Sequence, residues 1–424
     1  MNIIKLRPSW DGEAIIESRI DVDFYKFPMG QFIVRRYPGP RVKFGLKLRN
    51  KGVDLTKIIP KQKLVEQLDH AMSLLVTNSE IHYLRGTDEY GARMFGEDYL
   101  TFLRTSRLCQ YSLEYKDGEI ILEFYDYWKD VTYWETLALS IINELRNREL
   151  LLKMSRVERD AVFATGVTRL MEKIKILKAN PQIKFSEFGT RRRFTRAWQR
   201  YVVEILKEEL PKEQFKGTSN TLLAMQLDLM PTGTNAHELP MVISAIMGKD
   251  GNDAGLIEAQ QVLLREWWKM YGKGLSIFLP DTFGTESFLR HLDPEMAQNW
   301  IGPRLDSGDP IWEGDLWLGH YSKLGIDSRD KLLIPSDGLT LPEMIRIEEH
   351  FRDKIAVSFG WGSDVTNDLG IKALSLVIKP KEADGIETVK LSNNLAKAIG
   401  TETEVARYMR VHGYEQHERV ECKY

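Results

Sequence analysis

The second half of the chain contains short polar clusters whose residue types suit a phosphate-bearing ligand. Arg304 is followed closely by Asp306 and Asp309. A guanidinium group can bind two phosphate oxygens at once, and carboxylates are ligands that Mg²⁺ prefers in proteins. The cluster therefore predicts a site for a pyrophosphate group, with Asp309 as the candidate metal ligand. A structural ion pair is the alternative interpretation of the same residues.

A second cluster combines two glycines with a hydroxyl group. Gly360 and Gly362 flank Trp361 and precede Ser363. Because glycine has no Cβ, backbone N–H groups at such positions can approach a phosphate closely. The pattern predicts a phosphate-binding turn, and a plain tight turn is the alternative.

His237 is the candidate nucleophile. It follows Gly233 in a loop of small residues and stands just before an apolar segment at residues 242–247, which is expected to be helical. We expect this loop to leave the ring accessible. A neutral imidazole can attack phosphorus and can be held by a carboxylate partner. An ordinary polar histidine at a helix start is the alternative.

Five arginines lie between residues 191 and 200, beginning with Arg191. Lys and Arg together number 59 and Asp and Glu 61, so the formal net charge is −2. Proteins that coat nucleic acid or acidic membranes need a net positive field. We therefore interpret the cluster as a solvated face with one phosphate contact, and expect no nucleic-acid or membrane partner.

Three common catalytic motifs are missing from the sequence. There is no GxxxxGK[ST], no HExxH, and no GxGxxG after an expected strand. Their absence argues against a P-loop nucleotidase, a zinc hydrolase and a Rossmann-type oxidoreductase.

Each polar cluster in the second half follows a short apolar run. The runs include residues 183–188, 275–279, 332–334 and 355–358. Apolar runs in which polar residues do not alternate are typical of parallel strands that are covered on both faces. Repeated units of a strand followed by a helix indicate an α/β fold. The segment is close to the length of an α/β barrel, about 250 residues. In a barrel the carboxyl ends of the strands share one mouth, so the clusters should converge there.

The first half has a mixed α+β pattern. Alternation at residues 42–48 predicts a strand, residues 62–75 predict an amphipathic helix, and Asp117-Gly118 predicts the turn of a hairpin. Thr132 and Glu135 have the spacing of a capping box at the start of a helix. A last hairpin is expected around residues 374–391. We therefore expect an N-terminal α+β domain at residues 1–145, a barrel at 146–380, and a hairpin with a helical tail at 381–424 that packs on the N-terminal domain.

The composition is that of an ordinary globular protein, with 43% hydrophobic and 28% charged residues. Cys109 and Cys422 form neither a disulfide framework nor a metal motif, which favours a reducing cytoplasm. No secretory signal and no membrane span are expected. Most of the scattered tryptophans are expected to be core or helix-face residues and not a ligand-binding box; they are Trp10, Trp128, Trp134, Trp198, Trp267, Trp268 and Trp312.

Eight segments in order along the chain resemble those of the nicotinate phosphoribosyltransferase family. They are DFYK at 23–26, EFGTRRRF at 187–194, FKGTSN at 215–220, GTNAHE at 233–238, RLDSGDP at 304–310, SDGL at 336–339, FGWGS at 359–363 and KLS at 390–392. Each motif is short, but together they extend over nearly the whole chain.

The resemblance implies an irregular α/β barrel with an N-terminal α+β domain, and a cytoplasmic homodimer with sites near the subunit interface. It implies a ligase-type enzyme that starts NAD salvage. Nicotinate and phosphoribosyl pyrophosphate would give nicotinate mononucleotide and pyrophosphate, with ATP as co-substrate and Mg²⁺ as cofactor. His237 would be phosphorylated transiently.

The resemblance also implies residue roles. Catalytic roles fall to His237, Arg304 and Asp306. Substrate-binding roles fall to Tyr25, Arg191, Ser219, Thr234, Asp337, Gly360, Gly362 and Ser363. Tyr25, Thr234 and Arg304 would contact nicotinate, and Tyr25 would come from the partner subunit.

Three positions bear on these roles. Ser363 replaces a threonine that many relatives have, and it keeps the hydroxyl. Trp361 replaces a small aliphatic residue, which could narrow the phosphate pocket. Ser219 replaces the aspartate that holds the carboxamide in nicotinamide-using enzymes, and an aspartate there would repel nicotinate. The alternatives are a nicotinamide phosphoribosyltransferase and a non-catalytic phosphate or nucleotide sensor on the same barrel.

Overall fold

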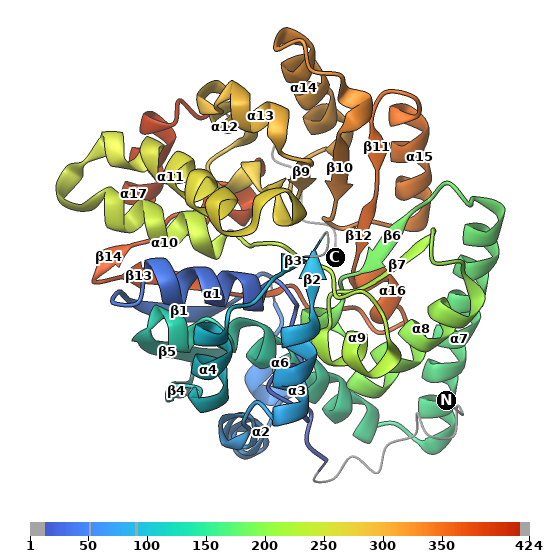
Figure 1. Cartoon of the computed structure of the whole chain (residues 1–424). Coiled ribbons are helices and arrows are strands. Elements are labelled where there is room, and N and C mark those ends of the chain that lie inside the picture. The colour runs from blue at the N-terminus through green and yellow to red at the C-terminus, as the bar shows by residue number, and fades with distance from the viewer. Residues whose placement is uncertain (1–12, 51, 90–91, 416–424) are drawn as a thin grey trace.

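The computed structural model describes residues 13–50, 52–89 and 92–415 (Figure 1). Within these ranges no helix combines the length and the apolar character that crossing a membrane requires.

An antiparallel sheet forms the centre of the N-terminal domain. Its strands are β1 (Arg41–Leu48), β4 (Tyr111–Lys116), β5 (Glu119–Tyr127), β13 (Leu376–Ala383) and β14 (Ile386–Glu387), in the order β14-β13-β1-β5-β4. The predicted hairpin is confirmed, with Asp117 and Gly118 at φ of 51° and 81° in its turn. Figure 1 shows β13 and β14, near the end of the chain, beside β1 near its start. The predicted boundary at residue 380 therefore falls inside a strand of this sheet.

Helices cover the sheet and connect it to the rest of the molecule. They are α1 (Lys26–Arg36), α2 (Lys61–Ser73), α3 (Asn78–Gly86), α4 (Glu97–Thr105), α5 (Trp128–Val131) and α6 (Trp134–Leu152), and a small hairpin is formed by β2 (Asp88–Glu89) and β3 (Ala92–Arg93). The helix expected at residues 62–75 corresponds to α2, and α6 is buried along most of its length.

The predicted capping box at the start of α6 is wrong. The N-cap residue is Tyr133, and no side chain caps the helix. Glu135 instead points into the interior, where its carboxylate lies 2.7 Å from Lys26 Nζ. A buried cation attracts this carboxylate more strongly than a free backbone N–H does.

The second domain is built from short parallel strands. They are β6 (Phe185–Glu187), β7 (Phe215–Thr218), β8 (Ile277–Phe278), β9 (Gly302–Leu305), β10 (Leu332–Pro335), β11 (Ala356–Val357) and β12 (Phe359–Trp361). They form two sheets, β11-β10-β9-β8 and β12-β6-β7. Strands β11 and β12 are separated only by Ser358, which joins the sheets on one side. On the other side Pro231 bridges to Thr218, and Asn235 donates a hydrogen bond to the Ile277 carbonyl at 3.2 Å. The expected irregular α/β barrel is confirmed.

Helices surround the barrel and extend to the C-terminal segment. They are α7 (Arg156–Ala179), α8 (Arg196–Glu209), α9 (Thr221–Leu227), α10 (Glu238–Met247), α11 (Asp253–Tyr271), α12 (Thr285–His291), α13 (Pro294–Asn299), α14 (Pro310–Lys323), α15 (Leu341–Phe351), α16 (Ser363–Thr366) and α17 (Glu402–Val411). Single 3₁₀ turns include η3 (Thr190–Arg192), η6 (Pro280–Thr282) and η8 (Leu395–Lys397). The tail helix α17 packs against α11 and Phe283.

Large aromatic side chains fill the core. Trp128, Trp134, Trp198 and Trp267 are almost fully buried, as expected of core residues, and so are Trp300, Trp317 and Trp361. Trp268 and Trp312 are only partly buried, and Trp10 lies outside the described residues. Phe278 of β8 stacks on Trp300 with ring centroids 4.4 Å apart. Cys109 is buried and free, and Cys422 lies outside the described residues.

Candidate active site

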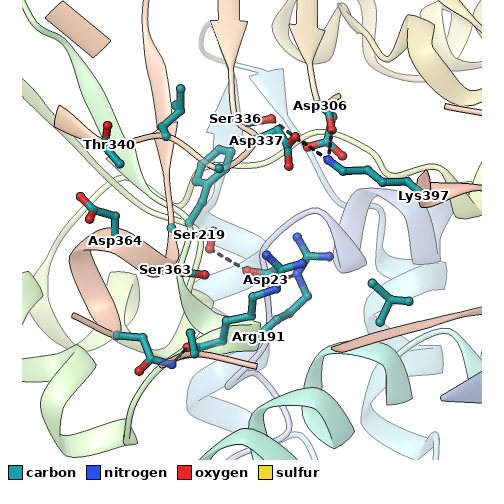
Figure 2. Close-up of a pocket in the computed structure, with 18 of the residues that line it drawn as sticks. Asp23, Arg191, Ser219, Asp306, Ser336, Asp337, Thr340, Ser363, Asp364 and Lys397 are labelled. Atoms are coloured by element: carbon teal, nitrogen blue, oxygen red, sulfur yellow. Dashed lines mark hydrogen bonds and ion pairs between the residues drawn. The ribbon is translucent and has the colours of Figure 1, made fainter. Parts of the chain in front are cut away.

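A cavity of about 700 Å³ opens where the carboxyl ends of the barrel strands meet the N-terminal domain. Its walls include His237, Arg304 and Asp306 from the barrel and Asp23 and Tyr25 from the N-terminal segment. Figure 2 shows side chains from several separate elements directed toward this space. The polar clusters that the sequence placed at strand ends therefore converge.

His237 is the residue just before α10, and both of its ring nitrogens have partners. Nδ1 lies 2.8 Å from the hydroxyl oxygen of Thr282, and Nε2 lies 3.0 Å from Asp306 Oδ2 and 3.4 Å from Asp281 Oδ1. The expectation of an accessible ring is wrong, because only 3% of His237 is exposed. The ring is enclosed by η6 and by Asp306, which follows β9, and the loop sequence alone does not reveal these contacts. Nε2 is the nitrogen on the side of the cavity-lining Asp306.

Burial and neighbouring charges determine the protonation states of His237 and Asp306. Burial lowers the pKa of His237 to about 4, although Asp281 and Asp306 oppose the shift. Burial would raise the pKa of Asp306, but its hydrogen bond with His237 and its attraction to Arg304 hold it well below the ordinary value. The pair is therefore a neutral imidazole beside an ionised carboxylate at neutral pH. A neutral imidazole keeps a lone pair that can attack an electrophile.

Arg304 is held in place by the histidine loop. Its guanidinium donates a hydrogen bond to the Asn235 carbonyl at 2.9 Å, and it lines the same cavity as His237. Asp306, two residues further, also accepts a hydrogen bond from Ser336 Oγ at 2.9 Å (Figure 2). Asp337 at the end of β10 faces the cavity and forms an ion pair with Lys397.

A second polar group lies on the N-terminal side of the cavity. Ser219 Oγ donates a hydrogen bond to Asp23 Oδ1 at 2.6 Å, and Arg191 Nε lies 3.0 Å from Asp23 Oδ2 (Figure 2). Burial raises the pKa of Asp23, and attraction to Arg191 opposes the shift. A carboxylate therefore stands beside Ser219 although residue 219 itself is not acidic. Asn143 of α6 fixes the backbone here by donating to the Arg191 carbonyl at 2.9 Å.

Tyr25 lines this cavity within its own chain, and a contribution of Tyr25 to the site of a partner subunit stays a prediction. The segment that carries it is tied to the end of β7, since the Phe24 N–H donates to the Ser219 carbonyl at 2.7 Å. The Arg191 guanidinium lies 5.8 Å from the centre of the Tyr25 ring. The ring therefore forms part of the wall beside Asp23 and Arg191.

The residues of the glycine-rich turn at 360–363 have two different roles, because some line the cavity and others pack in the core. Gly362 and Ser363 line the cavity at the start of α16, which suits the predicted phosphate contact. Gly360 serves packing instead: a Cβ at this position would lie 2.5 Å from the Phe188 ring. Trp361 does not narrow the cavity, because it is fully buried and packs edge-on against Phe185.

Asp309 and Thr234, which the sequence predicted for the site, do not line this cavity. Asp309 accepts a hydrogen bond from the Ile311 N–H at 2.9 Å and so caps α14. Thr234 lines a second cavity of about 710 Å³ at the amino ends of the strands. Both cavities share Arg304 and Phe188 as lining residues.

Three lysines that line the cavity were given no role from the sequence, although Lys390 begins the KLS segment at 390–392. Lys379, Lys390 and Lys397 come from the C-terminal segment and are largely buried. Burial lowers the pKa of Lys390 to about 8, and Asp281 opposes the shift. A lysine within the apolar run of β13 is a signal that could have identified Lys379, because buried lysines are rare without a partner.

The acidic residues suit a metal that arrives with its ligand. Within the described ranges, no three His, Cys, Asp or Glu side chains cluster as a metal centre. Asp306 and Asp337 line the cavity and offer one or two carboxylates. This is the donor set by which proteins hold Mg²⁺ together with substrate phosphates.

The chain is similar to known proteins over nearly its full length. Residues 183–416 match the model of the nicotinate phosphoribosyltransferase (NAPRTase) family, and residues 20–143 match the model of its N-terminal domain. The chain is 30% identical to nicotinate phosphoribosyltransferase from Vibrio cholerae, with 95% of each chain covered and a TM-score of 0.85. It is 27% identical to the enzyme from Porphyromonas gingivalis, with 94% of this chain and 100% of that chain covered and a TM-score of 0.83.

Proposed function

The chain belongs to the nicotinate phosphoribosyltransferase family, and from this premise we propose that it joins nicotinate to phosphoribosyl pyrophosphate in an ATP-coupled reaction. The ring nitrogen of nicotinate attacks the anomeric carbon of the ribose. The bond from that carbon to the pyrophosphate oxygen breaks, and nicotinate mononucleotide and pyrophosphate are formed. The product is the first intermediate of NAD salvage from nicotinate.

The cavity cations stabilise the leaving group. Arg304, Lys390 and Lys397 line the cavity together with Arg191, and fixed positive groups stabilise negative charge that develops in a transition state. Mg²⁺ held by Asp306 or Asp337 with the diphosphate would neutralise further charge on the leaving oxygens. Gly362 and Ser363 receive the 5-phosphate of the sugar.

His237 accepts the γ-phosphoryl group of ATP. In the structure the ionised Asp306 can only accept, so Nε2–H donates to Asp306 Oδ2 and Nδ1 accepts from the Thr282 hydroxyl. Phosphoryl transfer uses the other tautomer, in which Nδ1–H donates to Thr282 Oγ1 and Nε2, turned away from Asp306, carries the lone pair. A bond forms between Nε2 and the γ-phosphorus while the bond from this phosphorus to the ADP oxygen breaks. Water later releases phosphate from the histidine. The added negative charge beside Asp306 alters the affinity of the cavity for its anionic substrates.

The observation that carries this proposal is the placement of the buried neutral His237 beside Asp306 in the cavity lined by Arg304. The test is incubation of the purified protein with ATP labelled at the γ-phosphate. An acid-labile, base-stable label on His237 is expected. His237→Ala should lose the label and the ATP stimulation but keep weak uncoupled synthesis. Full ATP stimulation of this variant would refute the role of His237.

One observation favours a second candidate, the use of nicotinamide. The Asp23 carboxylate bonded to Ser219 can accept a hydrogen bond from an amide, whereas it repels a carboxylate. Arg191 and Arg304 offset this repulsion, so nicotinate remains the preferred substrate. Turnover of the acid and the amide, compared at equal concentration, separates the two. The homodimer and the cytoplasmic location stay predictions, and sedimentation of the purified protein tests the former.

A further inference from the structure

Lys26 is a fully buried lysine with a complete set of partners. Its Nζ lies 2.6 Å from Glu238 Oε2, 2.7 Å from Glu135 Oε2 and 3.4 Å from Thr132 Oγ1. An ammonium group has three donors, so these oxygens saturate it. Lys26 does not line the cavity, and its role is therefore not a direct contact with substrate.

One partner of Lys26 is attached directly to the candidate nucleophile. Glu238 is the first residue of α10 and follows His237 in the chain. Its other oxygen, Oε1, accepts a hydrogen bond from the Trp128 indole at 2.7 Å. The start of α10, and with it the backbone of His237, is thereby anchored to α1 and α5 of the N-terminal domain.

The other partner holds two cavity cations. Glu135 Oε1 lies 2.7 Å from Lys379 Nζ and 3.6 Å from Arg191 Nη1. Burial would raise the pKa of Glu135, but attraction to Lys26, Lys379 and Arg191 outweighs it and lowers the pKa. Lys26 thus links the element that carries the histidine to the side chains that face the other end of the cavity.

The charges in this group balance. Lys26, Lys379 and Arg191 are positive, and Glu135, Glu238 and Asp23 are negative. Removing the charge of Lys26 leaves two buried carboxylates next to each other with one fewer cation. Such carboxylates repel, and each must move or take up a proton. Either response displaces His237 or releases Arg191 and Lys379.

We propose that Lys26 is a positioning residue for phosphoribosyl transfer: by holding Glu238 and Glu135 it fixes His237 at one end of the cavity relative to Arg191 and Lys379 at the other. This inference rests on the function proposed above for the cavity. A misplacement of about 1 Å in an active site costs about 10²-fold in rate, so the effect is large enough to measure.

The experiment compares Lys26→Met with Lys331→Met. Lys331 is a buried lysine whose Nζ donates to the carbonyls of Ala297, Gln298 and Trp300, and it does not line the active-site cavity. Three quantities are measured for each full-length variant: the melting temperature, kcat and KM for synthesis without ATP, and the ring ¹⁵N resonances of His237, assigned with His237→Gln.

Lys26→Met is expected to lower kcat by about 10- to 100-fold and to shift the His237 resonances, whereas Lys331→Met should lower only the melting temperature. Wild-type kcat and unshifted His237 resonances in folded Lys26→Met would overturn the proposal, as would equal changes in both variants.

If Lys26→Met does not fold, Glu238→Gln replaces it, because it removes one of the two carboxylates and keeps its shape. The same loss of kcat and the same shift of the His237 resonances support the proposal, and their absence overturns it. If the wild-type protein makes no mononucleotide, the proposed function fails, and the His237 resonances still test the role of Lys26.

Discussion

Replacing Ser219 by aspartate is expected to change the preference of the cavity from nicotinate to nicotinamide. The Ser219 hydroxyl lies 2.6 Å from a carboxylate oxygen of Asp23 and only 3% of the residue is exposed. An aspartate at this position would bring a second carboxylate to about 4 Å from the first. At an effective dielectric of about 20, two unit charges at this distance repel by about 4 kcal/mol. The carboxylate of nicotinate, bound against the same wall, meets a repulsion of similar size.

The expected cost is therefore about 10³-fold in kcat/KM for nicotinate, since about 1.4 kcal/mol corresponds to a factor of ten. Nicotinamide carries no charge and can donate its amide hydrogens to an aspartate, so its kcat/KM should be unchanged or higher. The assay measures mononucleotide formation from each base under identical conditions.

Ser219→Asn is the matched control, because it has nearly the volume of aspartate without the charge. Ser219→Asp combined with Asp23→Asn separates repulsion between the two side chains from repulsion of the substrate. A Ser219→Asp variant that keeps the wild-type ratio of kcat/KM for the two bases would refute this account of specificity.

Further outcomes are expected from other groups in the cavity. Arg304→Met should lower kcat by about 10²- to 10³-fold in a steady-state assay, the usual effect of losing one preorganised donor; a change in KM alone would argue against a role in the transition state. Because burial lowers the pKa of His237 from 6.5 to about 4, the unfolded state binds more protons between these values, and the free energy of unfolding should fall as the pH falls. The loss reaches about 3 kcal/mol at pH 4, and urea titrations of His237→Gln should lack this part of the pH dependence. Since the pKa of Lys390 is about 8, KM for phosphoribosyl pyrophosphate should rise above pH 8 in the wild type, and Lys390→Arg, which stays charged, should remove that rise. Gly360→Ala would push against the Phe188 ring, which lines the cavity, so it should raise KM in the steady-state assay.

Local patterns in the sequence determined the elements of the fold. The alternation at residues 42–48, the Asp117-Gly118 turn and the apolar runs of the second half each depend on neighbouring residues, and the structure has strands or turns at these places. The order of strands and helices also placed the polar clusters at one end of a barrel, because parallel strands share the direction of their carboxyl ends. Arg304, Asp306 and His237 could therefore be expected together before any geometry was known.

Tertiary structure alone decided which charged groups meet. Lys26 pairs with Glu135 and Glu238, which are 109 and 212 residues further along the chain, and no local pattern specifies such partners. The apparent capping box at Thr132 failed for this reason, because burial makes an ion pair more favourable for Glu135 than a helix cap. The burial of His237 and its low pKa likewise depend on the tertiary structure, which places η6 and Asp306 against the ring. Local sequence determines which helix, strand or turn a segment can form. The burial of charged side chains away from water depends on the tertiary structure, and it determines which ion pairs they form and how they are protonated.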